Sequence, residues 1–385
     1  MNATGNNSFH KKLPMIFAHI GDLHINKAKE QNYKDFLSIV AQLEIECSNN
    51  LDFVFLPGDI ADHGEPEQYK MVSTALKMLS IPVHIIAGDH DMEQGSLDGF
   101  YKMLAAEHLP KSILIKNNRC IFLDVNGSGN GRPDFRLGNE QLSWLEIELS
   151  IAKENKEAIC IFMHTYPFDL VEPTEKVVLN KLIAEHDVVL VDMGHTHYNE
   201  LANDGHTIFS AVRSTGQIEE GPVGYSFISI DNGFVSWRFK QMEDPFPFVM
   251  ITSPADYRLM RNDKYVEGNV EIRAVIFNTK NIKTVNCYVK DRDAITMSRN
   301  DKNSWSAIIN FPSKELTEIT VQAIDENGWP GQHTIHVASS SYKRKKVIQS
   351  GSDAASIGAW PENGIFGTQL GPNRNAKPSP PPSLK

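Results

Sequence analysis

The sequence is poor in cysteine and contains no long apolar run. Its four cysteines, at positions 47, 120, 160 and 287, are too few and too far apart for the disulfide framework of a small secreted domain. We therefore expect buried thiols in a reducing compartment. No stretch approaches the roughly 20 apolar residues of a membrane-spanning helix. The first apolar run, Met15 to Ile20, ends at once at Gly21 and Asp22, so no secretory signal is expected. These features predict a cytoplasmic protein without a membrane association.

An excess of basic residues is also missing. The chain has 38 Lys and Arg residues against 48 Asp and Glu residues, a net charge of −10. Proteins that bind nucleic acid place many lysines and arginines against phosphates, so this balance disfavours a nucleic-acid partner. A metal-centred site for a small anionic substrate would need no basic surface.

The length and the hydrophobic pattern predict two domains and two flexible ends. A chain of 385 residues exceeds the size at which one core keeps growing. From residue 13 to 242, short apolar runs alternate with amphipathic segments, which predicts an α/β domain whose sheets are covered by helices. From 243 to 340 the pattern becomes strictly alternating, which predicts a smaller all-β sandwich.

Residues 1–12 and the Ser-, Lys-, Gly- and Pro-rich stretch 341–385 are predicted to be flexible. The second stretch nevertheless contains Trp360, Ile365, Phe366 and Leu370. These apolar residues could dock on the first domain of this chain or on a partner, and the sequence does not decide between the two.

Five short segments rich in Asp and His lie in order along the first 200 residues, each directly after a predicted strand. They contain Asp22 and His24; Asp59; Asp89, His90 and Asp91; His164; and His195 and His197. Ligands of α/β sheets bind beyond the carboxyl ends of the strands, and these residue types are ligands for divalent transition metals. Because side chains i and i+2 of an extended segment point the same way, we expect His195 and His197 to reach adjacent metals. The pattern predicts a site for two metal ions.

These segments resemble the calcineurin-like metallophosphoesterase superfamily, whose consensus runs D-x-H, G-D, G-N-H-D, H and G-H-x-H. The resemblance implies an α/β/β/α sandwich and two divalent or mixed-valence ions, which could be Mn, Fe, Zn, Co or Ni. It assigns one ion to Asp22, His24 and His197, the second to Asp89, His164 and His195, and a bridging position to Asp59. The all-β part resembles the immunoglobulin-like modules of bacterial hydrolases.

The resemblance also implies a reaction. A metal-bridging hydroxide would attack phosphorus in line, and the substrate would be a small phosphoester. His90 would stabilise the transition state and protonate the leaving oxygen, with Asp91 orienting it by accepting a hydrogen bond. The stretches 137–145 and 214–225 look like the branch containing bacterial cyclic-nucleotide phosphodiesterases, so we expect a phosphodiesterase. Arg132 and Arg136, beside the glycine-rich loop 127–131, are expected to contact the substrate.

The chain departs from the consensus at Asp89, where the family has Asn. Three carboxylates contribute −3 against +4 for two divalent ions, which leaves about +1 where the family's Asn would leave about +2. We therefore expect tighter metal binding, weaker attraction of phosphate and a slower enzyme.

Other interpretations stay open at this point. The protein could be a metal-binding scaffold with little turnover, a phosphomonoesterase, or a nuclease with the same ligand set. The β-sandwich and the tail could bind a protein or a polymer.

Overall fold

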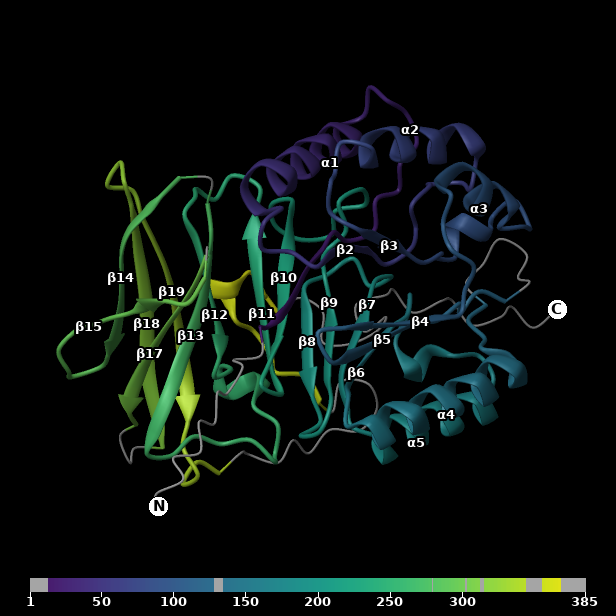
Figure 1. Ribbon diagram of the computed structural model, residues 1–385. Helices are drawn as coiled ribbons and strands as arrows, with labels where there is room; N and C mark the ends of the chain where they lie inside the picture. The colour runs from purple at the N-terminus through teal and green to yellow at the C-terminus, as the bar shows by residue number, and fades with distance from the viewer. Residues whose placement is uncertain are drawn as a thin grey trace, which may run out of the picture.

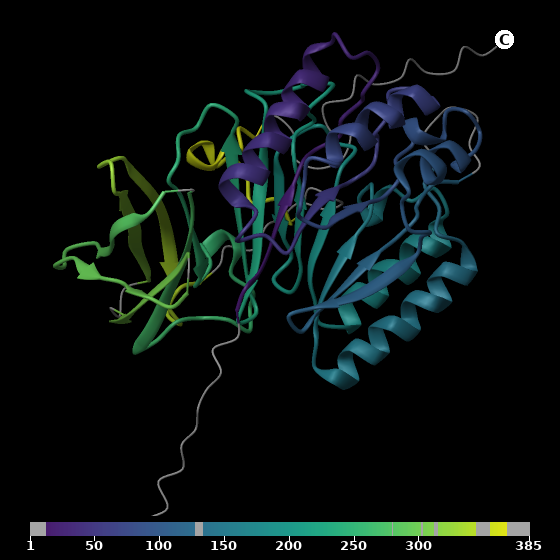
Figure 2. The same ribbon diagram turned by 45° about the horizontal axis from the view of Figure 1, so that its top comes forward.

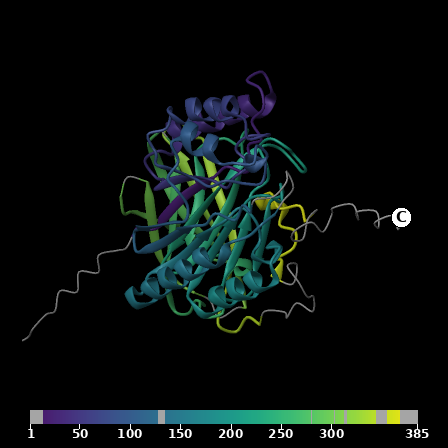
Figure 3. The same cartoon turned by 90° about the vertical axis from the view of Figure 1, so that its right-hand side faces the viewer.

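The computed structural model describes residues 13–127, 134–278, 280–301, 303–311, 315–343 and 355–367. Two β-sheets stack face to face with helices on both outer faces, so the predicted α/β/β/α sandwich is confirmed (Figures 1 and 3). The predicted substrate contact Arg132 lies outside the described residues. Within them, no helix is both long and apolar enough to cross a membrane.

The first sheet has the strand order β11-β10-β1-β2-β3. Its strands are β1 (Met15–His19), β2 (Phe53–Leu56), β3 (Val83–Ile85), β10 (Gly224–Asp231) and β11 (Phe234–Gln241). The outer face packs under α1 (Gln31–Gln42), α2 (Pro66–Leu76) and α3 (Asp98–Leu104). Strands β1, β2 and β3 run parallel, so their carboxyl ends lie at one edge.

The second sheet has the order β4-β5-β6-β7-β9-β8 and is covered by α4 (Gly138–Asn155) and α5 (Pro173–Glu185). Its strands are β4 (Lys111–Ile115), β5 (Asn118–Phe122), β6 (Ala158–Phe162), β7 (Val188–Met193), β8 (Glu200–Asn203) and β9 (Ile208–Ala211). The alternation of strand side chains explains the layering. On β1, Ile16 and Ala18 face the helices, whereas Met15 and Phe17 enter the core between the two sheets.

The all-β part consists of two four-stranded sheets that enclose a separate core (Figure 2). One sheet contains β12 (Phe248–Ser253), β13 (Asn269–Phe277), β17 (Ser304–Asn310) and β16 (Ser298–Arg299). The other contains β15 (Ile295–Thr296), β14 (Ile282–Val289), β18 (Leu316–Asp325) and β19 (Pro330–Ala338). The predicted β-sandwich is therefore present.

The sandwich also shares a core with the first domain. Phe248 and Phe277 point out of the sandwich and join the cluster that contains Tyr225 and Phe227 of β10. The rings of Phe227 and Phe277 stack with their centroids 4.0 Å apart. Because apolar burial and ring stacking both stabilise this contact, the two parts form a packed junction.

Residues 355–367, which we call the edge strap, pack against the first domain, so the prediction of a flexible tail is wrong over this range (Figure 1). Trp360 and Ile365 are 5% and 2% exposed and extend the core between the two sheets. The burial of these two side chains offsets the entropy lost in ordering the segment. Within the described residues the docking surface is this chain's own first domain.

The edge strap covers the outer strands of both sheets. The backbone N–H of Ile357 donates to the carbonyl oxygen of Leu201 on β8, at 3.0 Å. Asn363 forms hydrogen bonds with the backbone of β11. Its side chain accepts from the N–H of Phe239 at 3.3 Å and donates to the carbonyl oxygen of Trp237 at 3.0 Å. Unpaired edge strands tend to pair with other chains, so the strap protects both sheets from that association.

Candidate metal centre

The seven predicted metal ligands converge in two groups that share Asp59. Within each group the ligand atoms lie within 4.8 Å of one another. The first group is Asp22, His24, Asp59 and His197, and the second is Asp59, Asp89, His164 and His195. This is the division that the family resemblance implies.

Both sheets supply ligands at the carboxyl ends of their parallel strands. Asp22, Asp59 and Asp89 follow β1, β2 and β3, whereas His164 and His195 follow β6 and β7. Because the two sheets stack with these ends at the same edge of the sandwich, the loops meet above the core between them. A substrate can approach this edge without entering the hydrophobic layers.

Several ligands occupy a backbone conformation that is rare for residues other than glycine. The φ angles are 43° at His24, 49° at Asp59, 66° at His195 and 62° at His197. Each such residue costs on the order of 1–3 kcal/mol and persists where the surrounding structure demands it. The expectation of an extended segment at residues 195–197 was therefore wrong. The two imidazoles reach different groups through two left-handed turns.

Two glycines make room for the ligand carboxylates. A Cβ atom on Gly88 would lie 2.2 Å from Oδ1 of Asp59, and one on Gly194 would lie 2.3 Å from Oδ1 of Asp22. Real Cβ contacts are never this short, so a side chain at either position would displace a ligand.

The first group has polar atoms that a cation would satisfy. Oδ2 of Asp22 accepts a hydrogen bond from the N–H of His195 at 2.7 Å, but the buried Oδ1 has no hydrogen-bond partner among the described residues. Nε2 of His24 lies 3.0 Å from Nε2 of His197. Buried polar atoms are normally paired, so an unpartnered carboxylate oxygen beside two imidazole nitrogens fits a metal ion.

In the second group, a backbone contact fixes the orientation of a histidine ligand. Nδ1 of His164 donates to the carbonyl oxygen of Pro57 at 2.7 Å, so Nε2 faces the carboxylates. Oδ1 of Asp89 lies 3.2 Å from Nε2 of His164 and 3.2 Å from Nδ1 of His195. Burial opposes the charge on His164, but Asp59 and Asp89 raise its pKa well above the ordinary value.

Asp59 remains ionised between the two groups. Burial by itself would raise the pKa of Asp59, but the neighbouring His164 outweighs it and lowers the pKa to about 2. A shared, ionised carboxylate is the group that can bind two cations at once. The donor set of both groups therefore fits two divalent ions.

His90 lies at the mouth of the centre and is oriented by the backbone. Its Nδ1 donates to the carbonyl oxygen of Asp62 at 2.9 Å and lies 3.3 Å from Oε1 of Glu93. Its ring packs edge-to-face on that of His24, with the centroids 4.6 Å apart. Burial opposes the protonated form, but the carboxylate of Asp59 and the carbonyl of Asp62 raise the pKa of His90.

Asp91 does not orient His90, so its predicted role was wrong. The buried Asp91 carboxylate accepts backbone hydrogen bonds from Gly88 at 2.9 Å, Ala61 at 3.1 Å and Ile60 at 3.2 Å. Burial raises the pKa of Asp91 to about 6, with Asp59 adding to the effect. Adjacent side chains of a helical turn point in different directions, and residues 90–92 form such a turn. Asp91 instead joins the loops that carry Asp59 and Asp89.

Gln217 is a contact that sequence reasoning missed. Its Nε2 donates to Oδ1 of Asp62 at 3.2 Å and lies 3.3 Å from Nδ1 of His24. Asp62 lies 3.5 Å from the same Nδ1, and its hydrogen bond with His24 lowers the pKa of Asp62. Gln217 and Asp62 thus hold His24 from the side opposite Asp59. No local spacing could reveal this, because Gln217 and His24 are 193 positions apart.

Arg136 is already occupied by two carboxylates. Its Nε donates to Asp134 at 2.6 Å, and its Nη1 donates to Glu172 at 2.7 Å. The neighbouring Phe135 is the residue that reaches the metal centre, with its ring centroid 4.8 Å from that of His195. A substrate contact by Arg136 remains a prediction.

The part of the chain that carries the metal centre is similar to known proteins. Residues 15–199 match the family described as calcineurin-like phosphoesterase. The chain is 27% identical over 212 residues to a probable cyclic nucleotide phosphodiesterase of Coxiella burnetii, a match that covers 51% of this chain and 82% of that protein. It is 29% identical over 159 residues to a probable glycerophosphodiester phosphodiesterase of Arcobacter nitrofigilis, a match that covers 40% of this chain and 58% of the relative.

Among solved structures, a dimetal phosphatase from Danio rerio aligns with a TM-score of 0.46 and 15% identity, over 60% of this chain and 97% of that one. The family match and the seven converging ligands cover the same part of the chain. Residues 15–199 therefore form a calcineurin-like metallophosphoesterase domain.

Proposed function

We propose that this protein is a metal-dependent phosphodiesterase that uses two metal ions. The observation that carries the proposal is the pair of ligand groups joined by Asp59. Asp22, His24 and His197 would hold one ion, and Asp89, His164 and His195 the other. When bound, such ions lower the pKa of coordinated water and neutralise charge on phosphoryl oxygens.

His90 is the proposed general acid. Its Nδ1 is committed to the carbonyl oxygen of Asp62, so Nε2 is the nitrogen that can donate to a leaving oxygen. The raised pKa of His90 favours the protonated ring that this role requires. Asp62 and Gln217 would act indirectly, by holding His24 in place.

The charge of the site favours a diester over a monoester. A diester carries a single negative charge, whereas a monoester is nearly dianionic at neutral pH. Three carboxylates would leave two divalent ions with a net charge of about +1. Arg136 adds little attraction because Asp134 and Glu172 already neutralise it. Relatives named as cyclic nucleotide and glycerophosphodiester phosphodiesterases agree with this preference.

The remaining parts of the chain are assigned by the same proposal. Residues 13–242 would be the catalytic unit, and residues 243–340 an immunoglobulin-like accessory module, which its two antiparallel four-stranded sheets support. The four cysteines are free and buried, which supports the reducing cytoplasm as the compartment. The substrate would be a small phosphoester rather than nucleic acid.

Hydrolysis assays with matched variants test the proposal. The purified protein is analysed for metals and then assayed with bis(p-nitrophenyl) phosphate, p-nitrophenyl phosphate, cyclic nucleotides and linear DNA. We expect Asp59→Asn to abolish diester cleavage and His90→Ala to lower kcat by about 10²- to 10⁴-fold. The control is His63→Ala, because His63 is a half-exposed neighbour of the site that belongs to neither ligand group, and it should keep most of the activity. A protein that binds two metals but cleaves no phosphoester would instead be a scaffold.

A further inference from the structure

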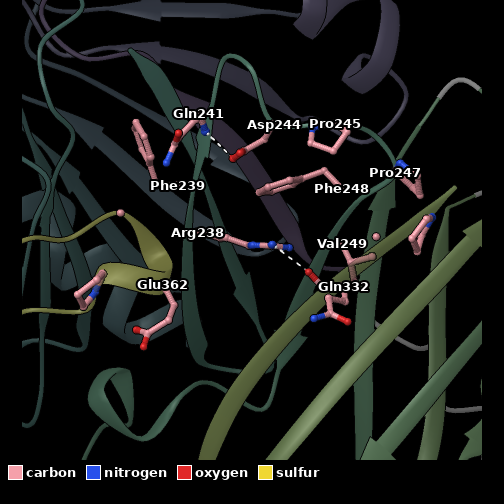
Figure 4. A pocket seen from close by; sticks show the side chains of 14 residues that line it. Arg238, Phe239, Gln241, Asp244, Pro245, Pro247, Phe248, Val249, Gln332 and Glu362 are labelled. Carbon is pink, nitrogen blue, oxygen red and sulfur yellow. Dashed lines mark hydrogen bonds between the residues drawn. The ribbon is translucent and has the colours of Figure 1, made fainter. Parts of the chain in front are cut away.

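A cavity of about 320 Å³ lies where the first domain, the β-sandwich and the edge strap meet (Figure 4). It is lined by the end of β11, the linker 244–247 and the starts of β12 and β19, and the edge strap closes one side. None of the seven metal ligands lines it. Its volume falls within the range of small-ligand sites, which commonly lie at domain junctions.

Arg238 is the polar group at the centre of this cavity. Its Nη2 donates to the carbonyl oxygen of Gln332 at 3.0 Å, and its guanidinium lies 4.0 Å from the ring centroid of Phe248. The buried Nη1 has no hydrogen-bond partner among the described residues, and no carboxylate there lies within ion-pair distance of Arg238. Figure 4 shows the side chain extending between Phe248 and Gln332.

The charge around Arg238 is incompletely balanced. Lys240 lies two residues further on the same strand face. Among the described residues its Nζ donates only to uncharged oxygens, including the carbonyl oxygen of Asp244 at 2.8 Å. The carboxylate of Asp244 accepts from the N–H of Gln241 at 2.9 Å. Glu362 is exposed at the rim. Burial lowers the pKa of Arg238 to about 9 and that of Lys240 to about 8, and Asp244 opposes both shifts.

We propose that this cavity binds a small organic ligand through a carboxylate or phosphate group that pairs with the guanidinium of Arg238. Arginine suits such oxyanions because its planar fork donates several hydrogen bonds and keeps its charge. Phe248 and the prolines at positions 245, 247, 330 and 361 supply an apolar wall for the rest of the molecule. An anion here compensates the charge of a partly buried cation.

Binding measurements with two probes test this site. Benzoate and inorganic phosphate are titrated into the metal-loaded full chain, with wild type, Arg238→Gln and Asp59→Asn compared by calorimetry and ligand-observed NMR. We expect Arg238→Gln to weaken at least one probe by tenfold or more, while Asp59→Asn retains that binding. Loss with benzoate identifies a carboxylate site, and loss of a second phosphate-binding step identifies a phosphate site. Binding that is absent in wild type, unchanged in Arg238→Gln or lost only in Asp59→Asn overturns the proposal.

A measurement on the wild type removes any dependence on the folding of the variant. Phenylglyoxal modifies arginine side chains, and peptide mass spectrometry gives the rate at each position. We expect the probe that binds to slow the modification of Arg238 severalfold and to leave Arg299, an exposed arginine of the sandwich, unaffected. Equal rates at Arg238 with and without both probes would overturn the assignment.

Discussion

Asp89 stands where the family consensus has Asn, and the substitution Asp89→Asn measures what the additional carboxylate does. Its Oδ1 lies 3.2 Å from both His164 and His195. Burial opposes ionisation, but hydrogen bonds from these two imidazoles hold the pKa of Asp89 well below its ordinary value. The carboxylate is therefore charged throughout the working pH range, and asparagine would remove one full negative charge.

Metal binding and substrate attraction should respond in opposite directions. Losing a charge-assisted interaction costs about 1.5–3 kcal/mol, which corresponds to roughly ten- to hundredfold weaker binding of one metal ion. The net charge of the loaded site rises from about +1 to about +2. A unit charge at about 4 Å is worth about 4 kcal/mol at an effective dielectric constant of about 20, and solvent at the open site reduces this value. We expect kcat/KM for a diester at saturating metal to rise about tenfold or more.

The assay has two parts. Metal is titrated into metal-free wild type and variant, and kcat/KM for bis(p-nitrophenyl) phosphate is then measured at saturating metal. Asp98→Asn is the control, because it makes the same chemical change at an exposed position at the start of α3. Unchanged metal affinity together with unchanged kcat/KM in Asp89→Asn would refute the reasoning.

Asp91→Asn leaves at least one buried backbone N–H without an acceptor. Urea denaturation should therefore show about 1–3 kcal/mol less stability, and the pH profile of kcat should be unchanged. If Asp91→Asn were as stable as wild type but had a shifted pH profile of kcat, Asp91 would instead act on His90. Burial opposes the charge on His164, but two carboxylates raise its pKa well above 6.5. Because metals bind the unprotonated ring, metal affinity should increase as the pH rises above 6.5. In the metal-free protein, protonated His164 contributes its full stability below pH 6.5, and this contribution is lost as the pH rises through the raised pKa. A metal affinity and a free energy of unfolding that do not change with pH would contradict these two predictions. Trp360→Ala should lower the free energy of unfolding by about 3–5 kcal/mol because the indole is buried. The control Trp329→Ala, at a 64% exposed position, should lower it by about 0.5 kcal/mol or less. Equal losses in urea denaturation would contradict the docking of the edge strap.

The α/β layering and the convergence of the metal ligands at one edge were predictable from local order in the sequence, whereas the division of the ligands into two groups came from the family resemblance. Short apolar runs indicate buried strands. A ligand directly after a parallel strand lies at the same edge of the sheet as the ligands that follow the neighbouring parallel strands. Asp22, Asp59 and Asp89 follow this rule on three neighbouring strands. The order of the motifs therefore predicted that these three carboxylates lie together.

What could not be predicted depends on side-chain direction and on distant contacts. The turn at residues 90–92 sends Asp91 into the interior and His90 toward the mouth, a difference that adjacency in sequence conceals. Gln217 approaches His24 from a loop 193 positions away. The stacking of Phe227 on Phe277 joins two domains whose patterns were interpreted separately. The docking of the edge strap could not be predicted from the composition of the tail, because two buried side chains among many polar residues give no periodic pattern.

The position of the edge strap near the carboxyl end has a consequence for protein synthesis. Strands β8 and β11 are complete by residue 241, but the residues that cover their edges are translated more than 100 residues later. At ordinary elongation rates of about 5–20 residues per second, the nascent first domain emerges from the ribosome with two uncovered edges for several seconds. A message truncated before the codon for Ser356 would make that interval permanent, so its product should accumulate as aggregates even though every metal ligand is present.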